Sequence, residues 1–142
     1  MKRCVLFVLI AAALTATAWS QDDHCTDKGK ESAHVAGPHG LEAWTIDYAL
    51  PDSSYGDECF SGVLVIARNG HVIRRRKADG FIWSWVFWDD GKQLAIEEGP
   101  LHFGMSCVLE DLKSGHTIAT YDCYHGLPAD APEWVKAVDT MN

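Results

Sequence analysis

Three strand–turn–strand units recur along the second half of this sequence, and they constrain its fold more than any other feature. Their turns are centred on Gly70, Gly91 and Gly115, at spacings of 21 and 24 residues. Each glycine lies between two short apolar runs, and the first turn is Asn69-Gly70, a pair that tolerates the positive φ angles of a tight hairpin. The repeated pattern predicts consecutive antiparallel hairpins.

One more strand is expected ahead of these hairpins, because apolar and polar residues alternate from Trp44 to Tyr48. We therefore predict an all-β fold, an antiparallel meander of about seven strands forming a small sandwich or a partly closed sheet. The run 81–88 is apolar on both faces, which is typical of a covered central strand. Alternation predicts two faces for this run, one with Phe81, Trp83, Trp85 and Phe87 and the other with Ile82, Val86 and Trp88.

The N-terminus has the pattern of a secretory signal peptide. Met1-Lys2-Arg3 precedes the apolar run 4–14, and a positive start followed by a run of about a dozen apolar residues is typical of export. A membrane-spanning helix needs about twenty apolar residues, so we predict no membrane span. The small residues Ala18 and Ser20 predict a cleavage site, preferably after Ser20. We expect residues 1–20 to be removed and the mature protein to be secreted or periplasmic.

The predicted mature chain retains four cysteines, and these are the disulfide candidates: Cys25, Cys59, Cys107 and Cys123. An even number in an exported chain indicates two disulfides, and no two cysteines stand close enough for the usual zinc-ligand spacing. Cys107 and Cys123 each lie eight residues from Gly115, which favours their pairing across one hairpin and leaves Cys25 for Cys59. The register of that hairpin is not fixed, so a link from Cys59 to Cys107 or Cys123 stays open.

The net charge argues against one class of partner. The chain has 12 Lys and Arg against 20 Asp and Glu, a formal charge of −8, and removal of Lys2 and Arg3 with the signal peptide takes it to −10. An acidic protein repels phosphate backbones, so we predict that nucleic acid is not a partner. The same field would attract a basic protein.

The mature chain divides into a short polar segment and one domain. Residues 21–40 are polar and contain several glycines, so we expect a loose N-terminal segment held at Cys25. Residues 41–142 form a single β domain in this interpretation.

The C-terminal region breaks the β pattern. Asp130, an early proline and Glu133 have capping-box spacing, which predicts a short helix at about residues 131–141. Trp134 falls on its apolar face and should dock the helix on the sheet.

The hairpins resemble the blades of WD40-like β-propellers of the TolB type. The resemblance covers about residues 62–122 and is carried by Asp90-Gly91-Lys92, the apolar strand after it, and a strand that ends in Asp111 before the turn at Gly115. A full propeller needs at least about four blades of four strands, so a chain of this length cannot form one. The resemblance implies blade-like hairpins and a role in binding proteins or saccharides, with no family active site to carry over.

The sequence displays no catalytic or metal-binding constellation. The serine-nucleophile pattern G-x-S-x-G is incomplete at Gly104–Val108, which lacks the second glycine. The seven histidines form neither an H-E-x-x-H motif nor a pair at i, i+4. We therefore predict no catalytic residue, no metal site and no cofactor.

The candidate ligand surface consists of aromatic and basic strand residues: Trp83, Trp85, Trp88, Arg74 and Arg76. Aromatic side chains stack on saccharides, but in strands they more often belong to a core, which we favour here. The two arginines alternate and therefore share a face, where they would hold an anion or pair with acidic residues 97–98 or 110–111 of nearby strands. We favour either a solvated face or that pairing over an anion site.

Together these observations favour an exported, non-enzymatic domain that binds a protein, a saccharide or another component of the cell envelope. A secreted inhibitor of a basic hydrolase is one alternative, and its affinity would fall steeply with salt. A small enzyme whose site the sequence does not display is the other. Substitution of single His or Asp residues would then remove its activity.

Overall fold

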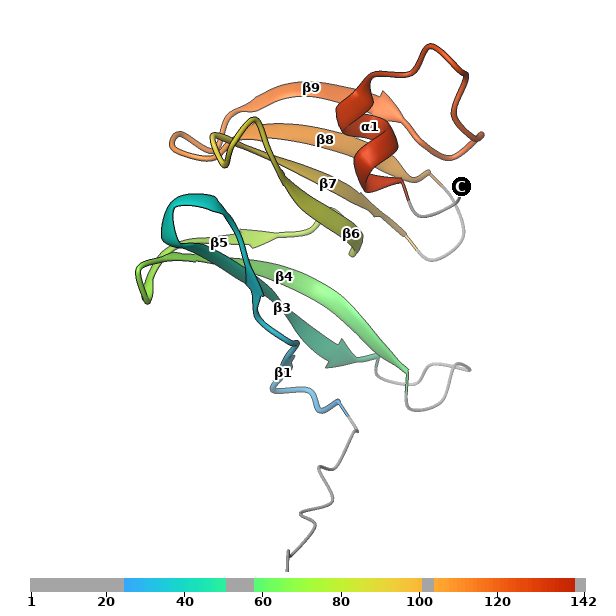
Figure 1. Cartoon of the computed structure of the whole chain (residues 1–142). Helices are drawn as coiled ribbons and strands as arrows, with labels where there is room; N and C mark the ends of the chain where they lie inside the picture. The colour runs from blue at the N-terminus through green and yellow to red at the C-terminus, as the bar shows by residue number, and fades with distance from the viewer. Residues whose placement is uncertain (1–24, 51–57, 101–103, 140–142) are drawn as a thin grey trace, which may run out of the picture.

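The computed structural model describes residues 25–50, 58–100 and 104–139, and the predicted signal peptide lies outside them. The described chain forms two antiparallel β sheets, one of five strands and one of four, and a short C-terminal helix (Figure 1). Neither sheet closes on itself. The predicted all-β fold is therefore confirmed, in its sandwich form.

The first sheet has the strand order β1-β3-β4-β5, with β2 also paired to β3. A 3-10 helix, η1, leads into β3. The predicted Asn69-Gly70 hairpin joins β4 to β5, and both turn residues have positive φ, 51° and 78°. The elements of this part are β1 Lys30–Glu31, β2 Val35–Ala36, η1 Pro38–Gly40, β3 Leu41–Ala49, β4 Cys59–Arg68 and β5 His71–Lys77.

The second sheet is a meander in sequence order, β6-β7-β8-β9. The β6–β7 and β8–β9 hairpins turn at Gly91 and Gly115, as the spacing of the glycines predicts. The chain passes from the first sheet to the second through residues 78–80, so β5 and β6 do not continue a single sheet. The strands are β6 Phe81–Trp88, β7 Gln93–Gly99, β8 Ser106–Asp111 and β9 Thr117–Asp122.

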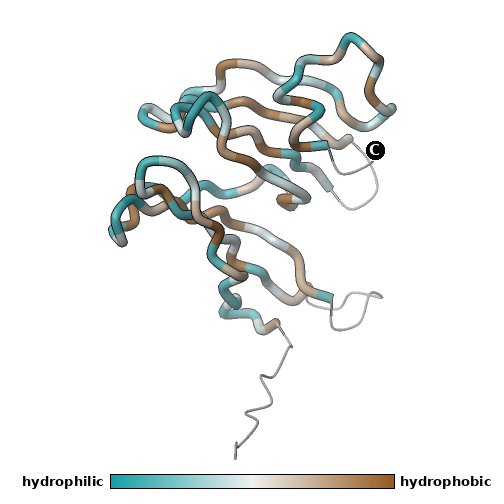
Figure 2. The backbone as a smooth tube through the Cα atoms, in the orientation of Figure 1, coloured by the Kyte–Doolittle hydropathy of each residue, from teal (hydrophilic) through white to brown (hydrophobic). Residues whose placement is uncertain are grey.

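The main core lies between the two sheets. Figure 2 shows hydrophobic residues concentrated along the strands and hydrophilic ones at many of the turns. Burial of these apolar side chains from both layers is the main stabilising term of such a sandwich. The buried residues of this core are Leu41, Ala43, Leu64 and Ile66 from the first sheet and Ile82, Leu94, Ile96 and Leu112 from the second sheet and its last turn.

The strand β6 contains a bulge that changes the predicted faces. Ile82 pairs with Glu98 and Ser84 pairs with Glu97, which leaves Trp83 without a partner position. One extra residue moves the following side chains to the opposite face. Ile82 therefore lies in the core together with Trp85, and the strict alternation that we predicted for this strand is wrong.

The helix α1, Glu133–Val138, covers the outer face of the second sheet (Figure 1). Val135 and Val138 are fully buried against that sheet, and Trp134 is partly buried in the same cluster. The helix therefore docks on the sheet as predicted, but Val135 and Val138 are more completely buried in this contact than Trp134. The last two residues of the predicted helix, 140 and 141, lie outside the described residues.

The predicted start of the helix is wrong. Pro132 occupies the N-cap position with a ψ of 144° and no side chain caps the helix, so the capping box from Asp130 does not form. A proline keeps the residue before it out of the helical region, which delays the first helical residue to Glu133.

The N-terminal segment is attached to the first sheet at several points. Both β1 and β2 hydrogen-bond to β3, and the ring of His34 stacks on Trp44 with 3.9 Å between centroids. Trp44 belongs to a second apolar cluster on the outer face of this sheet, with Val65 and Ala67. The described part of residues 21–40 thus differs from the loose segment that its polar sequence predicts, because short edge pairings satisfy its backbone.

Both disulfides form in the favoured scheme. Cys107 bonds to Cys123 and Cys25 bonds to Cys59, with Cα–Cα distances of 5.8 and 5.5 Å. The open alternative, a link from Cys59 to either of the other two, does not occur. Cys107 and Cys123 are fully buried beneath α1, whereas Cys59 is exposed.

Candidate functional site

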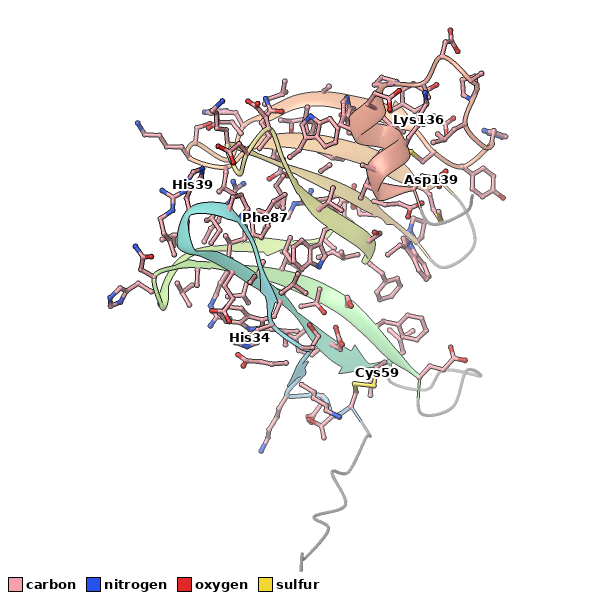
Figure 3. All side chains as sticks on the ribbon, viewed as in Figure 1. His34, His39, Cys59, Phe87, Lys136 and Asp139 are labelled. Carbon is pink, nitrogen blue, oxygen red and sulfur yellow. A yellow bond between two sulfur atoms is a disulfide. The ribbon has the colours of Figure 1, made fainter. Side chains whose placement is uncertain are left out.

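A cleft opens between the two sheets where three turns of the chain meet. It has a volume of about 750 Å³, whereas two other surface cavities measure about 350 and 330 Å³. Alternate turns of a meander lie at the same end, which brings the turns at Gly70, Gly91 and Gly115 together. Figure 3 places His39 at this end, between the two layers. The lining residues are His39, Arg68, Ile73, Arg74, Asp90, Gly91, Lys92, Asp111, Leu112 and Lys113, and we call this site the inter-sheet cleft.

A histidine–aspartate pair joins the two sheets at the rim of this cleft. The Nε2 atom of His39 lies 2.7 Å from Oδ2 of Asp90, and both side chains are largely exposed. The hydrogen bond and the charge of His39 hold the pKa of Asp90 below its usual value. Both residues have positive φ, 54° and 53°, a conformation that is uncommon for residues other than glycine.

Asp111, the other acidic residue of the cleft lining, is also hydrogen-bonded. Oδ1 of Asp111 accepts hydrogen bonds from the hydroxyl and the backbone N–H of Ser114, each at 2.6 Å. These bonds, the hydroxyl's first, lower the pKa of Asp111. Both acidic side chains of the lining therefore already have partners.

The basic residues of the lining differ in how they are paired. Lys92 lies 3.2 Å from Asp89, and Arg74 binds acceptors deeper in the molecule. Arg68 and Lys113 make no side-chain hydrogen bond or ion pair with another residue in the part of the chain that the structure describes. Neither cation would have to give up a side-chain hydrogen bond to bind a ligand, although the charge of Lys113 helps to lower the pKa of Asp111.

An ion-pair network lies next to the cleft and includes one of its lining residues, Arg74. Arg74 donates to Glu110 at 2.8 Å, and Arg76 donates to Glu110 at 2.9 Å and to Glu98 at 2.7 Å. The side chains of Arg76, Glu98 and Glu110 are only 12, 7 and 6% exposed. The pairing that we favoured for the two arginines is confirmed, with Glu98 and Glu110 as the acidic partners.

Burial and pairing act in opposite directions on Arg76. Desolvation lowers its pKa, whereas hydrogen bonds and charges from Glu98 and then Glu110 raise it, and the net pKa lies above the usual value. The guanidinium group is thus fixed in its charged form between two carboxylates. Arg76 serves to hold the sheets together, and among the predicted ligand-surface residues only Arg74 lines the inter-sheet cleft.

The three predicted surface tryptophans do not converge. Trp83 is partly exposed beside Phe81 and donates its indole N–H to the carbonyl of Gly99 at 3.2 Å. Trp85 packs against the core between the sheets, and Trp88 packs on the other face toward α1. A shared saccharide platform of the three is therefore absent.

Sequence reasoning missed most of the cleft residues, although a signal was present. A basic residue stands within two positions of each of the three turn glycines: Arg68, Lys92 and Lys113. In a meander these positions fall at one end of the fold, so the repeat predicts a cluster of cations. His39 and Ile73 carry no comparable signal, because only the tertiary fold brings them there.

Neither a metal centre nor a membrane helix is found within the described ranges. No three His, Cys, Asp or Glu side chains gather there as potential ligands, and no helix among them is long and apolar enough to span a bilayer.

Comparison with known proteins gives no assignment. No protein-family model matches this sequence. No significant match was found among curated proteins or among solved structures. The propeller resemblance of the hairpins therefore stays a prediction.

Proposed function

We propose that this chain is an exported binding domain that holds its ligand in the inter-sheet cleft. The observation that carries the proposal is the cleft itself, a cavity of about 750 Å³ lined by side chains of both sheets. Binding sites for small ligands are typically concave, of about 300–1,000 Å³, and few in each protein. The lining contains both charged and apolar side chains, which could bind the polar and the apolar parts of a ligand.

Rigid walls support this proposal. The ion pairs of Arg76 with Glu98 and Glu110 and the shared apolar core hold the two sheets at a fixed spacing. A ligand that enters a preformed cleft loses less free energy to ordering of the protein. Turns mounted on such a scaffold are common positions for binding residues.

The export part of the proposal rests on the signal-peptide pattern and on the disulfides. Two disulfides in a chain of this size are typical of an oxidising compartment. Mass spectrometry of the protein from its native source should give Gln21 as the first residue. An intact Met1 on the folded, disulfide-bonded protein would contradict export.

A fragment screen by amide NMR tests the cleft. Acidic, basic and neutral fragments are added to the labelled mature protein, and hits should shift amides of residues 68–74, 90–92 and 111–115. Ile73→Trp should fill the cleft and remove these shifts. Val72→Trp is the matched control, since Val72 and Ile73 are both 49% exposed and only Ile73 lines the cleft. Hits that bind elsewhere, or that survive Ile73→Trp unchanged, would contradict the proposal.

A small enzyme acting in the same cleft is a second candidate, favoured by the His39–Asp90 pair. A carboxylate that orients a histidine is a common arrangement for a general base. Turnover of any ligand found by the screen would then be lost in His39→Gln, while its affinity would change little. Unaltered ligand recovered after long incubation would leave binding as the function.

A further inference from the structure

We propose that the inter-sheet cleft binds a small organic anion, a carboxylate with a short apolar body. This inference rests on the proposed function and adds the chemical class of the ligand. The charged end would lie between Arg68 and Lys113, and the apolar body would lie on Ile73 and Leu112.

Basic residues are concentrated at the cleft end of this acidic protein. The lining contains four basic residues and two acidic ones, in a chain whose formal charge is −8. Three of the basic residues come from the three turns, which the meander brings together. Because Arg74 is paired with Glu110 and Lys92 with Asp89, the positive charge that remains for a ligand lies on Arg68 and Lys113.

The charged residues of the lining differ in whether they already have hydrogen-bond partners. Asp90 is hydrogen-bonded to His39, and Asp111 is hydrogen-bonded to Ser114. Among the described residues, neither Arg68 nor Lys113 has a side-chain hydrogen bond or ion pair, although the charge of Lys113 helps to lower the pKa of Asp111. An incoming anion therefore gains two cations without breaking a hydrogen bond of either, whereas an incoming cation would compete with the existing partners of Asp90 and Asp111.

The cleft also has apolar surface near Arg68 and Lys113. Ile73 is 49% exposed and lines the cleft, and Leu112 lies at its wall. Covering a half-exposed isoleucine side chain removes apolar surface from water and therefore strengthens binding. Inorganic anions would leave this surface in water, so an anion that carries an aliphatic or aromatic body fits better.

The overall charge limits the size of the ligand. Exposed charges farther away than about 8–10 Å are largely screened at physiological salt, so a small anion in the cleft is governed by its close neighbours. A long polyanion would extend over the acidic remainder of the surface and be repelled. The ligand is therefore expected to be contained within the 750 Å³ of the cleft.

Octanoate is a suitable probe, with octylamine, octanol and inorganic sulfate as comparisons. Titration into the labelled mature protein should give saturable shifts of amides 68–74 and 111–115 with octanoate. Octanol and sulfate should bind at least about tenfold more weakly, since each lacks one of the two contacts. Octylamine should produce no saturable shift in the cleft.

Matched variants identify the residues. Arg68→Gln and Lys113→Gln should each weaken octanoate binding about tenfold, the effect of losing one charge-assisted hydrogen bond. Arg75→Gln is the control, because Arg75 is an exposed arginine of β5 that does not line the cleft. The affinity of Arg75→Gln for octanoate should remain within about twofold of that of the wild type.

The outcomes separate this inference from the proposed function. If octylamine or octanol occupies the cleft as tightly as octanoate, the cleft binds ligands but the anion class is wrong. If octanoate leaves the cleft amides unshifted, or binds Arg68→Gln and Lys113→Gln as tightly as Arg75→Gln, the inference is overturned. The proposed function then depends only on the fragment screen and Ile73→Trp.

Discussion

Arg76 of β5 and Glu98 of β7 meet between the two sheets, 22 residues apart in the sequence, with 2.7 Å between Nη2 and Oε1. Glu98 also accepts a hydrogen bond at 2.9 Å from the backbone N–H of Asp79, in the segment that links the sheets. Through Glu110 the same arginine reaches β8. One buried guanidinium thus links three strands and, through Glu98, the segment that joins the two sheets.

The Arg76→Ala variant should be strongly destabilised. Loss of the Arg76 guanidinium leaves Glu98 without its charged partner and leaves Glu110 paired with Arg74 alone. Removal of one member of a buried ion pair lowers the free energy of unfolding by about 3–5 kcal/mol. Arg75→Ala, on the exposed side of the same strand, should change the free energy of unfolding by less than about 0.5 kcal/mol. Denaturant unfolding measures both. Equal stability of the two variants would show that the network does not hold the sheets together.

The two disulfides should contribute unequally. Cys107–Cys123 closes 16 residues and is fully buried beneath α1, so its removal by paired Ala substitutions should cost about 3 kcal/mol of loop entropy plus lost packing. Cys25–Cys59 closes 34 residues, but Cys59 is exposed, so packing adds little there. Thermal unfolding of the two paired variants should give the lower Tm for loss of Cys107–Cys123. The reverse order would contradict the packing argument.

Truncation after residue 129 should destabilise the domain by about 3–5 kcal/mol, because the second sheet loses two fully buried valines, Val135 and Val138. Calorimetry of the truncated and full chains measures the change. Lys136→Ala, at an exposed position of the same helix, is the control and should be nearly neutral. A truncated chain with an unchanged Tm would show that α1 does not contribute to the fold.

Asp111 should titrate below the usual aspartate value of about 3.9, because the hydroxyl and backbone N–H of Ser114 stabilise its charged form. A depressed folded-state pKa contributes stability that is present above the unfolded-state pKa and is lost as the pH falls through the folded one. Carbon-detected NMR of the carboxyl group follows this titration. Ser114→Ala should raise the pKa of Asp111 and leave that of Asp90, which depends on His39, unchanged. An unchanged Asp111 pKa in Ser114→Ala would exclude the hydroxyl as its main cause.

Local chemistry explains what could be predicted from the sequence. Asn69-Gly70 specifies its turn with two residues that accept positive φ, and apolar runs on either side specify the paired strands. The pairing of Cys107 with Cys123 followed from their distances to Gly115. Each of these features depends on residues close together in the chain.

Features that depend on distant residues were not predictable in the same way. The bulge at Trp83 is defined by the register of β6 against β7, and register is only weakly encoded where both faces are apolar. The cleft needs His39, Arg68 and Lys113 in one place, and it forms only because the chain starts a second sheet after β5. Long-range packing determined both.

A crystal structure of the mature protein with the tightest-binding fragment tests the central claim most directly. We predict ligand density in the inter-sheet cleft, in contact with Arg68, Lys113 and Ile73. Density in another cavity, such as the one that Phe81 and Trp83 line, with the inter-sheet cleft empty, would contradict the account.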